Sequence, residues 1–167
     1  MDSRWEVIVA ALAAAAGLFL RWMDKRGQRQ ASEERAGMAR GAITAGLQGP
    51  ALLQLPALES ALGPLLRHGT LANSITSAYR TPEHNAEVGG SPTSLHLQGL
   101  ALDISTTDNK AARDALARAA RDGRLVNVRE IISYEKTVHV HIAFQPGRSA
   151  PPAVSHDNGD GTHTRIA

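Results

Sequence analysis

Two short segments of this chain carry side chains that together could form a metal site. Ser94–Asp103 (SLHLQGLALD) places a histidine and an aspartate seven residues apart across a glycine. Tyr134–His141 (YEKTVHVH) places two histidines at alternate positions. Apolar residues alternate along Leu100–Ile104 and Val138–Ile142, as they do in β-strands with one buried face. The polar side chains of each strand therefore point away from its apolar face.

The residue types in these segments are those of a zinc site with an open position. Catalytic zinc is usually held by three protein ligands, neutral imidazoles and carboxylates, and water takes the fourth position. His96, Asp103 and His141 supply such a set, which predicts one Zn²⁺ ion per chain. Glu135 and His139 share the face of His141 if the second strand runs unbroken, so they are candidate catalytic groups.

The pattern SxHxxGxAxD followed by HxH resembles the zinc D-Ala-D-Ala carboxypeptidase family of peptidoglycan peptidases, which includes L-alanyl-D-glutamate endopeptidases and phage endolysins. The same two segments are similar to the zinc site of the Hedgehog signalling domain. Ser77–Pro82 (SAYRTP) resembles the YR segment of the family. The resemblance extends over roughly Ile75–Phe144 and implies that His96, Asp103 and His141 are the zinc ligands.

The resemblance also suggests roles for the residues around the metal. Arg80 would bind a carboxylate of the stem peptide, with a salt bridge that braces the loop as the alternative, and Ser94 is placed with it in the substrate site. Many family members carry a carboxylate three residues before the last ligand, where this chain has Val138. Glu135 shares parity with the ligands and matches the acidic position of the Hedgehog-like site, so it is the first choice for the general base, with His139 the second. One of them could instead stabilise the oxyanion or protonate the leaving amine.

The implied function is hydrolysis of stem-peptide bonds in peptidoglycan, by a lytic endopeptidase or a D,D-carboxypeptidase. The alternatives are a zinc-stabilised binding module without turnover, and a membrane-anchored or virion structural protein with an accessory peptidase domain. The net charge is only +2, and the basic residues are scattered, which argues against nucleic acid as a partner. The chain has no cysteine, so disulfides and thiolate metal sites are excluded.

Composition divides the chain into four parts around an α+β domain. Residues 50–146 are the predicted zinc peptidase domain, with a small antiparallel sheet flanked by helices. Residues 24–49 are polar and rich in alanine and glycine, which is typical of a linker or stalk. Residues 147–167 lack hydrophobic periodicity and contain many turn formers, so we expect a flexible tail whose His156 and His163 are not ligands.

Residues 1–23 are predicted to form a hydrophobic membrane-anchor helix. Val7–Leu20 is an apolar run between the two tryptophans, Trp5 and Trp22, as interfacial aromatic residues flank a membrane span. A cleaved signal and a packed soluble helix are the alternatives, but Arg21–Asp24 stand where a cleavage site needs small residues. We therefore expect a membrane-associated protein, phage or bacterial, that acts on the cell wall. Its orientation stays open because positive charges follow the span.

Overall fold

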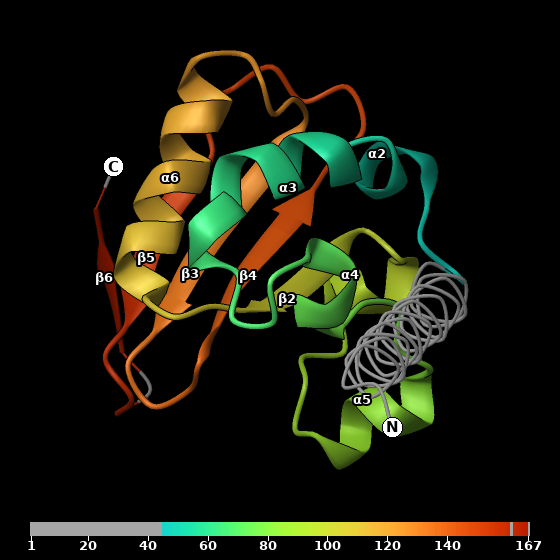
Figure 1. Cartoon of the computed structure of the whole chain (residues 1–167). Helices are drawn as coiled ribbons and strands as arrows, with labels where there is room; N and C mark the ends of the chain where they lie inside the picture. Colours follow the sequence, from blue (N-terminus) through green and yellow to red (C-terminus); the bar gives the residue numbers. More distant parts are fainter. Residues whose placement is uncertain (1–44, 161, 167) are drawn as a thin grey trace, which may run out of the picture. The chain divides into compact units, whose positions relative to one another are not determined.

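A six-stranded mixed sheet is the centre of the part of the chain that the computed structural model describes, residues 45–160 and 162–166 (Figure 1). The strand order is β1-β2-β4-β3-β5-β6. All neighbouring strands are antiparallel except β3 and β5, which are parallel. The strands are β1 (Ile75–Ser77), β2 (Ala101–Ser105), β3 (Val128–Tyr134), β4 (His139–Phe144), β5 (Ala153–Asp157) and β6 (His163–Arg165).

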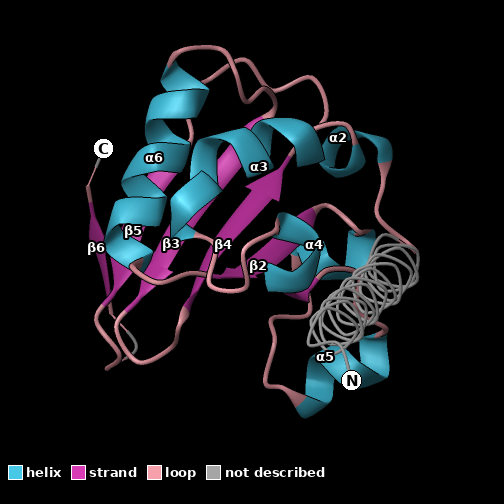
Figure 2. Cartoon of the chain, viewed as in Figure 1, coloured by secondary structure: helices cyan, strands magenta, loops and turns pink. Residues whose placement is uncertain are grey.

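Short helices precede the strands, and one longer helix, α6, connects β2 to β3. The α3 and α6 helices lie over the same face of the sheet (Figure 2). The side chain of Asp108 caps α6 by accepting a hydrogen bond from the Ala111 amide at 2.9 Å. The helices are α2 (Gly49–Leu52), α3 (Leu55–Leu62), η1 (Gly63–Leu65), α4 (Leu71–Ser74), α5 (Pro82–Glu87), η2 (Leu95–Gln98) and α6 (Asn109–Arg121).

The hydrophobic core fills the space between this helical layer and the sheet. Alternate residues of the two central strands point into it, together with apolar residues of the covering helices, because a strand places every second side chain on the same face. The largest fully buried members are Leu58 and Leu62 of α3, Leu102 and Ile104 of β2, Leu116 of α6, Ile131 of β3, and Val140, Ile142 and Phe144 of β4.

Two features of the sheet differ from the sequence-based prediction. The sheet is mixed rather than antiparallel, because β5 pairs parallel with β3. The segment 147–167, which we expected to be a flexible tail, contributes β5 and β6. Only Val154 in these strands is a buried apolar residue, so hydrophobic periodicity gave no signal. The strands form because β3 offers an unpaired edge that β5 satisfies.

The predicted ligand strand also has different bounds. The segment Tyr134–His141, considered above as one unbroken strand, is shared between the end of β3 and the start of β4. β3 continues to Tyr134, and a bend at residues 135–138 separates it from β4. Glu135 therefore does not belong to the strand that carries His141.

No helix in residues 45–160 and 162–166 is both long and apolar enough to cross a membrane. The predicted anchor, residues 1–23, lies outside the described residues, as does most of the predicted linker, residues 24–49.

The pairing of β5 with β3 predicts that residues 146–157 stabilise the domain. Ending the chain at Gln145 should lower the free energy of unfolding by about 1.5–3 kcal/mol from the loss of Val154 alone, and should leave the β3 edge open to association. Ending it at Asp157 is the matched control and should cost less than about 1 kcal/mol, because β6 is exposed. Urea unfolding measures both, and equal midpoints for the two truncations would show that β5 contributes nothing.

Candidate metal centre

The structure brings the three predicted ligands together from three different elements. His96 comes from η2, Asp103 from β2 and His141 from β4, and all three are buried. The Nε2 atom of His96 lies 3.3 Å from Oδ1 of Asp103, and Nδ1 of His141 lies 2.8 Å from the same oxygen. One candidate ligand atom from each residue lies within 4.8 Å of the others. We refer to these residues as the His–Asp–His trio.

Strand register places two members of the trio side by side. Asp103 and His141 are direct partners in the β2–β4 ladder. Their chain neighbours Leu102 and Ile142 are fully buried in the core. Because side chains alternate along a strand, Asp103 and His141 lie on the sheet face opposite α3 and α6.

The short η2 helix places the third member. The Ser94 hydroxyl caps η2 by accepting a hydrogen bond from the His96 amide at 3.3 Å. Gly99 ends the helix with φ of 64°, a left-handed conformation that favours glycine. A Cβ atom at Gly99 would also collide with the backbone carbonyl of Gly46. Ser94 therefore has a structural role here, and its predicted contact with substrate stays a prediction.

The segment that follows β1 holds the atoms of His96 and Asp103 that do not face the shared centre of the trio, Nδ1 of His96 and Oδ2 of Asp103. We call these the far atoms. The Nδ1–H group of His96 donates a hydrogen bond to the Ala78 carbonyl at 2.6 Å, which leaves Nε2 free to accept a metal ion. The other carboxylate oxygen of Asp103, Oδ2, forms an ion pair with Nη2 of Arg80. The Nε–H group of Arg80 donates to Ser77 Oγ at 2.7 Å. These contacts fix the orientation of both ligands.

Electrostatic interactions within the trio are strong because its side chains are buried. Burial acts to raise the pKa of Asp103, but its contacts with His141 and His96 outweigh burial and hold the pKa well below its usual range. Burial acts to lower the pKa of His141, but the contacts with Asp103 and Glu130 outweigh it and raise the pKa to about 9. A bound metal ion needs a neutral imidazole, so metal binding would release the His141 proton.

The trio suits zinc in donor type. Two imidazole nitrogens and one carboxylate oxygen are common zinc ligands, and three protein ligands leave a position open for catalysis. The residues that surround the trio hold its far atoms in the way that surrounding groups orient ligands in zinc sites.

Arg80 contacts the trio in the way expected for the alternative role, a salt bridge that braces the loop. Its side chain is 16% exposed, and its contacts with Asp103 and Ser77 are those of a brace. Binding of a substrate carboxylate by Arg80 stays a prediction.

His139 lies on the metal side of the sheet. It is two residues before His141 on β4, and its ring centroid lies 4.8 Å from that of Tyr134. Burial lowers the pKa of His139 below its ordinary value, so the imidazole is neutral at pH 7. A neutral imidazole beside the trio can accept or donate a proton.

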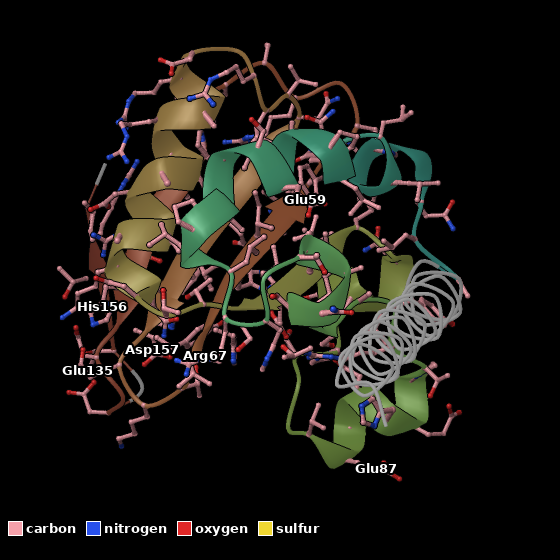
Figure 3. All side chains as sticks on the ribbon, in the orientation of Figure 1. Glu59, Arg67, Glu87, Glu135, His156 and Asp157 are labelled. Atoms are coloured by element: carbon pink, nitrogen blue, oxygen red, sulfur yellow. The ribbon has the colours of Figure 1, made fainter. Side chains whose placement is uncertain are left out.

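Glu135 lies on the other side of the sheet. Its Oε2 atom is 2.9 Å from Nε2 of His156 and 3.3 Å from Nζ of Lys110, at the start of α6 (Figure 3). The prediction that Glu135 shares a face with His141 assumed an unbroken strand, and the bend at residues 135–138 makes that assumption wrong. Whether Glu135 acts in catalysis stays a prediction.

Sequence reasoning missed two residues on the metal side, Glu130 and Tyr134. The Oε1 atom of Glu130 lies 3.7 Å from Nε2 of His141. Burial and the negative charge of Asp103 raise the pKa of Tyr134 to about 12. Alternation along β3 backward from the ligand strand could have pointed to Tyr134. The same alternation reaches Glu130 through Ile132, because the bulge in β3 lies before Glu130.

A comparison with protein families gives a match to Peptidase M15 over residues 29–143. The chain belongs to the M15 peptidase family. The predicted family is therefore confirmed, and the match includes the whole trio. M15 peptidases are zinc-dependent, in agreement with a trio that can hold a metal ion. No curated protein matches the chain. The family match ends before β5 and β6.

The trio predicts one zinc ion per chain. Replacement of His96, Asp103 or His141 by alanine should abolish stoichiometric zinc binding, because two ligands hold zinc poorly. His163→Ala is the control, since His163 is exposed on β6, and it should bind one equivalent. Metal analysis after dialysis measures the zinc content, and full occupancy in His141→Ala would exclude this ligand set.

The raised pKa of His141 predicts how the metal-free protein responds to pH. The proton on His141 stabilises the fold fully below the unfolded-state pKa of ~6.5, and this contribution is lost as pH rises through about 9. The free energy of unfolding should fall by at most about 3 kcal/mol over that range. Urea unfolding in the presence of a chelator measures it. His141→Ala should lack this pH dependence, and an equal fall in that variant would assign it to another group.

Proposed function

We propose that this chain is a zinc peptidase that hydrolyses stem-peptide bonds of peptidoglycan. The observation that carries the proposal is the His–Asp–His trio, which lies within the segment matched to the M15 family and has two of its far atoms held by hydrogen bonds or ion pairs. A zinc ion bound there would act as a Lewis acid toward a scissile carbonyl.

The side chains around the trio support the chemistry of peptide hydrolysis. His139 offers a neutral imidazole that can take a proton from water or give one to the leaving amine. The tyrosine ring packed against it, Tyr134, limits the positions that this imidazole can adopt. The geometry therefore favours His139 over Glu135 as the proton-transfer group.

Stem peptides offer carboxylates beside their peptide bonds, and Arg80 is a cation in direct contact with the trio through Asp103. A guanidinium group suits a carboxylate because two parallel N–H groups can bind both oxygens. Substrate binding by Arg80 would compete with its ion pair to Asp103. We propose that a stem-peptide carboxylate shares Arg80 with Asp103 in the complex.

The experiment that tests this function is digestion of purified sacculi by the zinc-loaded protein, with mass spectrometry of the products. We expect new stem-peptide ends, absent with His141→Ala. A free pentapeptide assayed in parallel identifies the bond: loss of D-alanine with intact sacculi assigns a D,D-carboxypeptidase, and cuts within the sacculi assign an endopeptidase. Zinc binding without any product would favour a binding module.

Two further variants in the same assay test the catalytic groups. His139→Ala should keep zinc and lower kcat by about 100-fold, the usual effect of losing an acid–base group. Glu135→Gln should have a smaller effect if its side chain stays with His156 and Lys110. A fall as large as that of His139→Ala would show that Glu135 moves to the metal side during turnover. Parental rates in both variants would place proton transfer elsewhere.

A further inference from the structure

We propose that Glu130 is a positioning residue for the metal: its carboxylate holds the His141 ring so that Nδ1 faces the trio. The proposal rests on the metal site of the proposed function. It assigns a role to a side chain that the sequence patterns of the zinc site do not include.

Regular alternation along β3 puts Glu130 on the metal side, in step with Ile132, and a bulge just before it separates its face from that of Val128. Val128 pairs with Phe144 and Glu130 pairs with Ala143, with a register shift between them. In a regular strand Val128 and Glu130 would share a face. Val128 instead packs in the core with Phe144, and Glu130 reaches toward His141 on the opposite face.

The strand after the bulge keeps this arrangement. Ile131 pairs with Ile142 in the core, and Ile132 pairs directly with His141. Bulges are common beside functional sites because they redirect one side chain without disturbing the rest of the sheet. Here the side chain that the bulge redirects into the core is that of Val128, and Glu130 keeps the metal-side register of Ile132.

The distances fit a carboxylate that orients a ligand from behind. Glu130 Oε1 lies 3.7 Å from Nε2 of His141, an ion-pair distance, while Nδ1 of the same ring lies 2.8 Å from Asp103 Oδ1. A carboxylate beside Nε2 keeps the proton on that nitrogen, which leaves the lone pair of Nδ1 for a metal ion. Glu130 thereby does for His141 what the Ala78 carbonyl does for His96.

Burial separates this contact from an ordinary surface ion pair. The side chain of His141 is 11% exposed and that of Glu130 is 32% exposed. Exposed ion pairs contribute little because solvent and side-chain entropy offset them. The pair of His84 and Glu87 on α5, 58% and 75% exposed, is such a contact and offers a matched comparison.

Zinc affinity, measured by competition with a chromogenic chelator, tests the proposal. Glu130→Ala should bind zinc about 10–100-fold more weakly than the parent, the usual effect of removing a group that orients a ligand. Glu130→Gln keeps an acceptor oxygen without the charge, so its affinity should lie between those of the parent and Glu130→Ala. Glu87→Ala is the matched control and should bind like the parent.

Zinc affinity of Glu130→Ala within about twofold of the parent would overturn the proposal, since the expected loss is at least about tenfold. Thermal unfolding of the metal-free variants verifies that they fold. If Glu130→Ala does not fold, a zinc affinity of Glu130→Gln equal to that of the parent overturns the proposal instead. The outcome is independent of substrate. A parent that binds zinc but leaves peptidoglycan intact would reject the proposed function and leave this role of Glu130 standing.

Discussion

The pairing of β2 with β4 is the interaction on which the metal site depends. It sets Asp103 directly opposite His141, and the buried neighbours Leu102 and Ile142 enforce that register. A slip by one residue would move these apolar side chains out of the core and both ligands into it. The hydrophobic core therefore fixes the geometry of the site.

The buried negative charge of Asp103 would destabilise the fold if no positive charge lay beside it. Asp103 is 6% exposed, and a buried carboxylate is tolerated only when it is paired and hydrogen-bonded. Two histidines and Arg80 surround it. In the metal-free protein the proton on His141 balances the charge, and a divalent ion would replace that proton. Arg80 also offsets the charge of Asp103 through their ion pair. A bound metal ion would weaken the need for that pair and so would affect whether Arg80 can bind another carboxylate.

The strand β3 links the site to β5 and β6, which lie beyond the family match. The regular part of the strand after its bulge places Glu130 on the metal side, and its last residue, Tyr134, packs against His139. Its outer edge pairs with β5, where His156 contacts both Ser133 and Glu135. The position of Glu135 is thus decided by β5 and α6, which explains why it lies away from the trio.

The sequence by itself determined the family, the α+β class and the three residues of the trio, because residue type and alternation along Leu100–Ile104 and Val138–Ile142 are local properties. Only the tertiary structure decided which other side chains contact the trio. The partner of Arg80 and the contact of Glu130 with His141 depend on how different elements pack together, and the bend at residues 135–138 put Glu135 with Lys110. The same holds for β5, where a single buried valine gives no periodic signal and the free edge of β3 supplies the reason for the strand.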